Sequence, residues 1–589
     1  MPVVSQRQRR VSITGPLGED VLLLRRMDGH EAISVPFEYQ VDLLSEDDQI
    51  KLEDVLARPM SLRLDMPQGN RRYFHGMVSR FTQTDAREFG QRLTPYQAIL
   101  RPWLWFLTRT ADCRIFQQQT VPDIVTSLFQ EHGFGDFESR LTGEYRIWNY
   151  CVQYRETDFN FISRLLEQEG IYYFFRHTAD SHTLVLCDDY SAHDPVPGYE
   201  TIPYYPPQQH QRRKRDHIFA WSLERQVQPG SFAINDFDYL VPKKNLQAMS
   251  SESRPHPLAD LEIYDYPGEY SQSEEANLYA RLRLEELQAR HETIRGQGNP
   301  YGLTVGALFE LENHPRDDQN REHLVTAATW QLVSDAFETG GDGEGPVFLC
   351  TFEAQDSQQP FRPARVTPKP VVQGPQTAVV VGKGGEEIWT DEHARVKVQF
   401  HWDRYGKSDE NSSCWVRVAQ VWAGKSWGAI HIPRIGQEVI VEFLEGDPDR
   451  PIITGRVYNG DNKPPYGLPA NATQSGILSR SSKGGSGANA NELRFEDKKG
   501  EERVTLHAEK DQSIEVENDE SHWVGNDRTK TVDRDETSHI KRDRTETVNQ
   551  HESITIGVNR TESVGSNETI TIGQNRTESV GKNETITVA

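Results

Sequence analysis

The residue groupings in this sequence that most resemble catalytic motifs each lack a residue that their chemistry requires. Gly-Lys-Ser occurs at Gly406 and again at Gly424, as it does in phosphate-binding loops. Such a loop needs a further glycine five positions earlier, and those two positions hold His401 and Ala419. No phosphate-binding loop is therefore predicted.

Two candidates for hydrolytic chemistry fail in the same way. Ser486 lies among glycines, but a Gly-x-Ser-x-Gly nucleophile elbow would need glycine at the position of Ala488. His291 is followed by glutamate, as in zinc-binding helices, but the second histidine is replaced by Arg295. Neither a serine nucleophile nor a zinc site is predicted.

Three carboxylates close together, Glu445, Asp447 and Asp449, are the remaining candidate for acid–base chemistry. Gly446 and Pro448 stand between them, and this composition favours a turn. A turn is therefore predicted in place of an acid–base pair. The sequence predicts no catalytic, cofactor-binding or metal-binding residue, and so no enzyme.

Composition excludes further classes. The 589-residue chain has a net charge of −24, which argues against a nucleic-acid-binding protein. No apolar stretch is long enough for a membrane span, and no secretory signal follows the basic residues at the N-terminus. The cysteines are odd in number and far apart, which is typical of buried thiols in a reducing compartment. They are Cys113, Cys151, Cys187, Cys350 and Cys414.

A repeat of eight residues organises the chain from its C-terminal end, residues 511–589. Successive octads read, for example, HESITIGV, NRTESVGS and NETITIGQ, with glycine after the sixth place in most later copies. The sixth place is always valine or isoleucine and is the predicted core of the repeat. These residues are Val516, Val524, Val532, Ile540, Val548, Ile556, Val564, Ile572, Val580 and Val588.

The octads predict strands, because Thr, Val and Ile alternate with polar residues at period two. One octad has too few apolar side chains to enclose a core by itself. Three octads would form about one turn of a three-sided coil, to which three chains could each contribute one side per turn. An intertwined homotrimeric β-helix is therefore predicted. A single-chain solenoid is the alternative; a disordered tail would not need an apolar residue in every eighth place.

The second place of the octads alternates in charge without a break. Its residues are Glu520, Arg528, Glu536, Arg544, Glu552, Arg560, Glu568, Arg576 and Glu584. In a threefold-wound helix each Glu would lie about 5 Å from an Arg of a neighbouring chain, which predicts an inter-chain charge ladder. As exposed pairs these would contribute only about 0.2–1 kcal/mol each, but they would reject a slip of one octad. Charges that only solubilise a surface would explain the polarity but not the alternation.

The sequence of residues 1–370 predicts a mixed α/β region in which strands dominate, with two β-barrel-like subdomains and several helices. Helices are expected at 120–133, 157–170 and 271–295, the last with a capping box formed by Ser271 and Glu274.

Residues 371–465, after a proline-rich linker, predict a small barrel. Strands with clean alternation are expected at 394–400, 415–419 and 438–443, among about five short strands separated by Gly- and Asp-containing loops. This pattern is typical of an OB fold. Residues 466–510 are predicted to be a neck with further strands, at 493–495 and 504–507.

Three stretches resemble one known family. Residues 395–460, which begin RVKVQFHWDRYGKS and end RPIITGRVYNG, look like the OB domain of the VgrG family (valine-glycine repeat protein G), the spike of the bacterial type VI secretion system. LRPWLWFLTRTADCRIFQQQTVPDIV (residues 100–125) and YCVQYRETDFNFISRLLEQEGIYYFF (residues 150–175) are similar to its hub region.

The resemblance implies a trimer similar to the fused hub and needle of contractile phage tails. Its implied partners are Hcp tube rings at the hub end, a PAAR-repeat cap and effectors at the needle end, and baseplate components, with only transient contact with a target membrane. It implies assembly in the cytoplasm and secretion without a signal peptide. The expected function is a non-enzymatic spike that punctures an envelope and delivers cargo.

Two departures from the pattern matter. The phage needle carries a lysozyme domain where this chain has residues 461–492, and the chain stops inside an octad, which leaves open whether the native protein continues past Ala589. A phage-derived tail spike and a β-helical cell-wall or polysaccharide hydrolase are the alternative functions.

Overall fold

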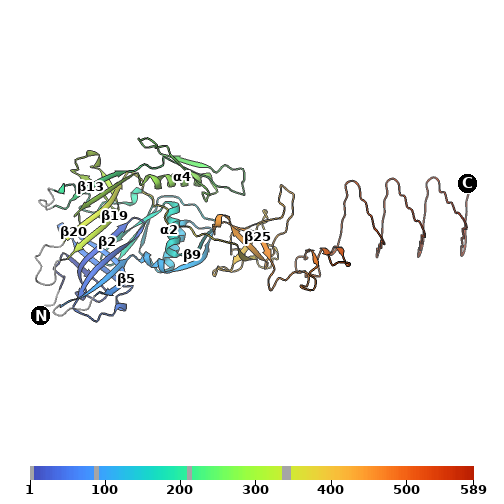
Figure 1. Ribbon diagram of the computed structural model, residues 1–589, viewed down its shortest axis with the longest axis horizontal. Coiled ribbons are helices and arrows are strands. Elements are labelled where there is room, and N and C mark those ends of the chain that lie inside the picture. The colour runs from blue at the N-terminus through green and yellow to red at the C-terminus, as the bar shows by residue number, and fades with distance from the viewer. Residues whose placement is uncertain (1–4, 85–91, 208–214, 335–346) are drawn as a thin grey trace. The chain divides into compact units, whose positions relative to one another are not determined.

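The computed structural model describes residues 5–84, 92–207, 215–334 and 347–589 (Figure 1). The chain divides into two compact units, Met1–Glu509 and Lys510–Ala589, and each is described by itself. Strands dominate the first unit. The boundaries of the four domains predicted from the sequence stay predictions, because these units divide the chain only once.

A 12-stranded mixed sheet forms the body of the first unit. The two halves of this region are joined in one sheet because β2 pairs with β19, which places Gly29 opposite Trp330. Its main path, in spatial order, is β1 (Val11–Thr14), β4 (Pro59–Asp65), β5 (Arg71–Gln83), β6 (Thr94–Arg101), β3 (Val35–Ser45), β2 (Leu23–Ala32), β19 (Glu322–Val333), β20 (Val347–Asp356), β17 (Glu292–Gly298) and β13 (Ile218–Arg225). Off this path, β18 (Leu308–Glu312) pairs with β19, and β12 (Thr201–Pro203) pairs with β18.

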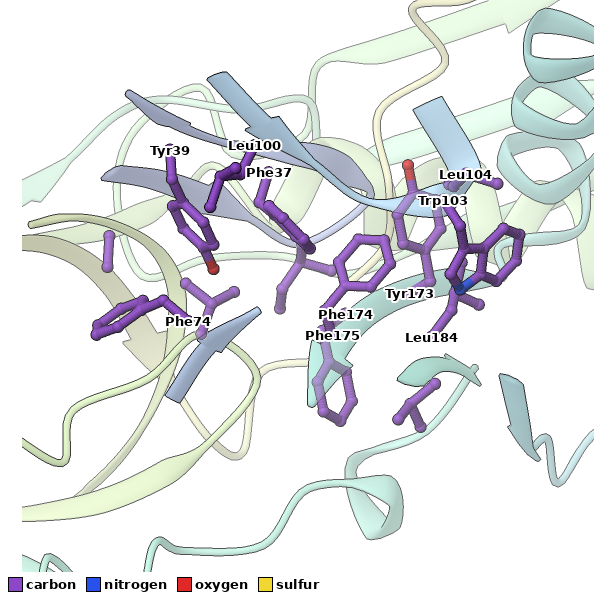
Figure 2. Packing of buried hydrophobic residues seen from close by; sticks show 14 of the residues in the cluster. Phe37, Tyr39, Phe74, Leu100, Trp103, Leu104, Tyr173, Phe174, Phe175 and Leu184 are labelled. Carbon is purple, nitrogen blue, oxygen red and sulfur yellow. The ribbon is translucent and has the colours of Figure 1, made fainter. Parts of the chain in front are cut away.

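Alternation along the strands produces the core of this sheet. In β3 every second side chain from Phe37 to Leu43 is buried, because neighbouring residues of a strand point to opposite faces. Figure 2 shows aromatic side chains of this core, among them Phe37, Tyr39 and Phe175, packed with other buried hydrophobic residues. Phe37 stacks on Tyr39 with ring centroids 4.7 Å apart and meets Phe175 edge-on at 5.0 Å. Such pairs contribute about 0.5–1.5 kcal/mol beyond the burial of their surface.

Two helices lie where the sequence predicts them. α1 (Val121–Glu131) begins after Thr120, whose hydroxyl accepts a hydrogen bond from the backbone N–H of Asp123. α2 (Asp158–Glu169) begins after Thr157 and ends at Gly170, whose φ of +72° suits glycine.

The prediction for the third helix is wrong at both ends. α4 (Ser273–Gln288) has Gln272 as its N-cap, and the capping box is formed with Glu275, whose carboxylate accepts the backbone N–H groups of Ser271 and Gln272. The helix ends at Gln288, well before Arg295, because the following residues form β17 between β13 and β20.

Three smaller sheets complete the region. α4 packs on the sheet that contains β14, with Tyr279 and Ala280 in the shared core. The sheets are β10 (Tyr172–His177), β11 (His182–Cys187) and β8 (Phe137–Arg140); β15 (Ala248–Ser251), β14 (Ser231–Ile234) and β16 (Glu262–Asp265); and β7 (Ala111–Phe116) with β9 (Cys151–Thr157).

The predicted OB barrel is confirmed. Five strands pair in one sheet, and a bridge between Val396 and Val416, with two backbone hydrogen bonds of 3.0 and 2.8 Å, connects its two edges. The spatial order is β22 (Lys397–Phe400), β21 (Gln376–Val381), β24 (Glu438–Phe443), β25 (Pro451–Val457) and β23 (Arg417–Val418). Val398, Phe400 and Val439 lie in its buried interior.

A three-stranded antiparallel sheet follows, where the sequence predicts a neck with strands. It contains β26 (Gln474–Leu478), β27 (Glu492–Glu496) and β28 (Arg503–His507).

The second unit, residues 510–589, is an open coil (the red-brown segment of Figure 1). All of its residues are described, and none of them takes part in a backbone–backbone hydrogen bond or a paired strand. Its backbone polar groups therefore depend on partners outside the chain. In the described part of the whole chain, no helix combines the length and the apolar character that crossing a membrane requires.

Candidate functional site: a surface open to partner chains

One face of the neck sheet is apolar and uncovered. The strand register aligns Ile477 with Leu493 and Leu506, and Phe495 with Val504, so these side chains lie on one face. All five are exposed, from 37% for Leu493 to 67% for Val504. A contiguous apolar sheet face of this kind marks an interaction surface.

The other face of the neck sheet is polar and partly covered by its own chain. The guanidinium of Arg494 lies over the ring of Tyr466 and pairs with Glu492 at 3.6 Å. Sequence reasoning named the strands but missed the apolar face, although the alternation of Leu493 and Phe495 was a usable signal.

The predicted core residues of the octads are not enclosed by the coil of a single chain. From Val516 to Val580 the sixth-place side chains are all between 45% and 54% exposed, and Val588 at the end is 88% exposed. Trp523 in a fifth place and Val558 in an eighth place are about 90% exposed. This difference favours the inner side of the coil for the sixth place. Their burial in a shared core stays a prediction, since the cover would come from other chains.

Three of the four arginines of the predicted charge ladder pair within their own octads. Arg560 lies 2.9 Å from Glu562, two positions later, and the equivalent pairs of Arg544 and Arg576 are 2.7 and 2.9 Å apart. Throughout residues 510–589, no second-place residue pairs with the second place of the next octad. The inter-chain ladder therefore stays a prediction.

Known protein families match along the chain in the same order as these parts. Residues 30–336 match the phage tail baseplate hub (GPD), residues 386–458 the type VI secretion system/phage-baseplate injector OB domain, and residues 475–588 the bacteriophage T4 gp5 C-terminal trimerisation domain. The last match covers the neck sheet and the octads together.

Sequence relatives decide the family. The type VI secretion system spike protein VgrG1b of Pseudomonas aeruginosa is 57% identical over 528 residues, 90% of this chain and 71% of the relative. VgrG1a of the same organism is 57% identical over 521 residues, 88% of this chain and 80% of the relative. This chain belongs to the VgrG family of type VI secretion system spike proteins. The predictions of family and of spike function are thereby confirmed.

A solved structure shares much of the fold of this chain. The E. coli c3393 protein, described as a component of the type VI secretion system with structural similarity to the T4 tail proteins gp27 and gp5, superposes with a TM-score of 0.53. The match covers 76% of this chain and 99% of that one at 23% identity, which supports the fold alone. It agrees with the predicted mainly β architecture.

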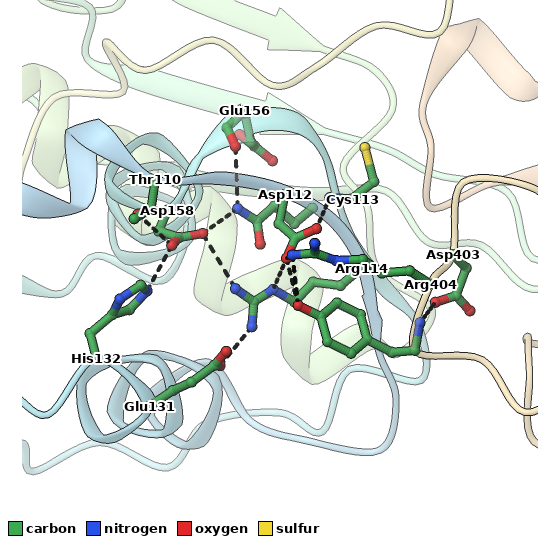
Figure 3. Close-up of polar contacts among 12 residues, drawn as sticks. Thr110, Asp112, Cys113, Arg114, Glu131, His132, Glu156, Asp158, Asp403 and Arg404 are labelled. Carbon is green, nitrogen blue, oxygen red and sulfur yellow. Dashed lines mark hydrogen bonds and ion pairs between the residues drawn. The ribbon is translucent and has the colours of Figure 1, made fainter.

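A polar cluster in the hub of this VgrG-family chain has the composition of a catalytic triad (Figure 3). The Asp158 carboxylate accepts hydrogen bonds from the Thr110 hydroxyl at 2.6 Å and from Gln153 at 2.6 Å, and lies 2.8 Å from His132 Nε2. In a triad the hydroxyl would donate to the histidine. Here it donates to the carboxylate, so the geometry is that of a buried structural network.

The same network joins the hub to the OB barrel. Asp112 of β7 accepts hydrogen bonds from the Tyr405 hydroxyl at 2.7 Å and from Arg404 at 2.6 Å (Figure 3). Burial alone would raise the pKa of Asp112, but these two hydrogen bonds, together with the backbone N–H of Cys113 and the charge of Arg114, lower it.

The carboxylates that the sequence assigns to a turn form a second connection. Glu445 is exposed in a turn at φ +55°, whereas Asp447 and Asp449 face the ammonium of Lys369 at 2.9 and 2.8 Å. Burial and the neighbouring Asp449 raise the pKa of Asp447 to about 6. Burial acts to lower the pKa of Lys369, but the carboxylates around it, including Glu269 at 3.2 Å, raise it. The predicted turn is present, and sequence reasoning missed its ionic partner.

Within residues 5–84, 92–207, 215–334 and 347–589, no three or more His, Cys, Asp or Glu side chains are arranged to hold a metal ion.

Proposed function

We propose that three copies of this chain form a rigid spike whose needle exists only as a trimer. The observation that supports this most strongly is the octad backbone, which has no hydrogen-bonding partner in its own chain. The sixth-place side chains of the octads are about half exposed, and the neck face separately exposes five apolar side chains. Two further copies would supply strands on both sides of every octad, which leaves no free strand edge along the shaft.

Mass measurement in solution tests this proposal. Light scattering of the purified full chain should give three times the 67.4 kDa chain mass. A monomer at micromolar concentration would overturn the trimeric needle.

The proposed role is to cap a tube of Hcp rings, to puncture a target envelope and to carry effectors. A stiff, narrow shaft with hydrogen-bonded strands transmits a thrust from the tube without bending. The partners proposed for the needle end are a PAAR-repeat cap and effectors, and baseplate components would hold the hub before release. Export would follow assembly in the cytoplasm and would need no signal peptide.

Binding to Hcp tests the polarity of this arrangement. The trimer should retain Hcp rings in a pull-down, and Val564→Asp, which alters only the needle, should retain them equally well. If the needle variant loses the rings, the tube binds at the opposite end from the one proposed.

We further propose that this chain acts without catalysis. The hub cluster around Asp158 lacks the hydrogen-bond order of a triad, and the carboxylates near Lys369 are held in ion pairs. Incubation of the protein with peptidoglycan separates the alternatives. Reproducible release of fragments would establish the cell-wall hydrolase instead. A phage-derived tail spike shares this architecture and differs in its genomic setting.

A further inference from the structure

Charged side chains of the octads lie on the same strand face as the predicted core residues. Residues two apart in an extended chain point to the same side, so Arg560, Glu562 and Val564 share one face. The side chains of Arg560 and Glu562 are 59% and 56% exposed, close to the 49% of Val564 as a residue. Arg534 and Asp535, at the bend between octads, are about 90% exposed. In the three octads with such a pair, the second- and fourth-place side chains are 51–67% exposed, which is closer to the sixth place than to the bend.

An ion pair across a bend supports the same assignment. Lys530, in the fourth place of its octad, pairs with Glu536, in the second place of the next. The chain turns between these residues, so both side chains reach across the inner side of the turn.

The opposite face carries small hydroxyl side chains. In the octad 559–566, the third and fifth places are Thr561 and Ser563. In the octad 519–526, the fifth-place Trp523 is almost fully exposed. This is the composition expected of an outer surface.

We infer that the needle interior is filled with charge as well as with valine and isoleucine, and that each inward arginine is enclosed by carboxylates from two or more chains. Arg560 contacts Glu562 of its own chain at 2.9 Å. The winding of the proposed trimer, on which this inference rests, brings Glu552 and Glu568 of neighbouring copies above and below it. The partner that this surface recognises is therefore a second copy of the same chain in one particular register.

Enclosure makes the register more selective than an exposed ladder would. Charges removed from water interact strongly, and a buried charge without an opposite partner is far more costly than an exposed one. A slip by one octad would place Arg beside Arg and Glu beside Glu inside the shaft, while every sixth-place residue stayed inward.

The fourth place adds a second register signal on the same face. From the fifth octad on it alternates between glutamate and isoleucine, as in Glu562 and Ile570. In the correct register each such Glu lies between isoleucines of neighbouring chains; after a slip, glutamates meet directly.

Thiol labelling of single-cysteine substitutions tests the face assignment. In the full-length trimer, Arg560→Cys should react with a maleimide at least tenfold more slowly than Thr561→Cys, and the two should react equally after denaturation. Labelling is measured relative to the unsubstituted protein, which has five cysteines of its own.

A second pair of cysteine substitutions keeps Arg560 in place, because loss of this arginine could itself loosen the needle. Ile570→Cys replaces an apolar fourth-place residue, and Thr571→Cys is its outward neighbour. Equal rates within both pairs, in a protein whose mass is that of a trimer, would overturn the inward assignment and leave the trimer intact. A monomeric mass would instead refute the proposed needle itself.

Discussion

Asp449 accepts a hydrogen bond from the backbone N–H of Val152 at 2.6 Å, and its other carboxylate oxygen lies 2.8 Å from the ammonium of Lys369. Val152 belongs to β9 of the hub, Asp449 to a turn of the OB barrel, and Lys369 to the proline-rich segment between them. One side chain thus connects three parts of the first unit.

Lys369→Met should loosen this junction. The substitution leaves Asp447, Asp449 and Glu269 close together without a cation, at a cost of about 3 kcal/mol. Because the pKa of Asp447 is already raised to about 6, the folded protein takes up protons there more readily than the unfolded chain. The loss should therefore be largest above pH 6 and shrink as the pH falls below it. Thermal unfolding followed at pH 5 and pH 8 measures this, with exposed Lys499→Met as the control.

Leu506→Asp should prevent assembly of the neck. Each buried leucine contributes about 1.5–3 kcal/mol, and three copies would bring three carboxylates together in an apolar core. Thr505→Asp, on the polar face of the same strand, should leave the mass unchanged in size-exclusion chromatography with light scattering. If both variants remain trimers, the apolar face of the neck is not buried between the three chains.

Val564→Asp should weaken the needle without affecting the hub. Three carboxylates would approach one axis and could be accommodated only by protonation or local unwinding. Resistance to heat and detergent should fall, while Thr561→Asp, which points to the other strand face, should have little effect. Gel mobility of unboiled samples gives the comparison, and equal effects would contradict the inward position of the sixth place.

Glu31→Gln should remove part of the pH dependence of the hub. Burial raises the pKa of Glu31 to about 7, against the opposing effect of Arg72 and of a hydrogen bond from Tyr39. The folded state then holds a proton that the unfolded chain releases near pH 4.5. Stability is therefore present at low pH and lost as the pH rises toward 7, by about 3 kcal/mol in total.

The glutamine variant should match the unsubstituted hub at pH 4.5 and exceed its unfolding temperature at pH 8. Exposed Glu310→Gln on β18 provides the matched control. Parallel pH profiles for the Glu31 variant and the unsubstituted protein would rule out this role.

Local signals predicted much of the fold. Thr120 and Thr157 cap their helices because capping depends on residues within one turn, and the octads are recognisable because their period repeats. The cap of α4 was misplaced by one residue because Glu274 and Glu275 are adjacent and only the folded turn selects between them.

Contacts between distant segments were not predictable in this way. Lys369 and Asp449 are far apart in the sequence, and nothing local to either specifies the other. The same holds for the pairing of β2 with β19, which joins the two halves of the large sheet. The apolar neck face was within reach of pattern reasoning and was missed because each of its strands is short.

The absence of backbone pairing in residues 510–589 has a kinetic consequence. A newly synthesised chain has buried cores in its hub and barrel, but its tail would need two other chains, so the first encounter would depend steeply on protein concentration. Once three necks have met, the tethered tails experience an effective concentration on the order of millimolar, and winding becomes intramolecular. Winding of the needle would then proceed from the neck toward Ala589. The rate at which a cell replaces used spikes would be limited by the encounter of three chains, and not by the winding.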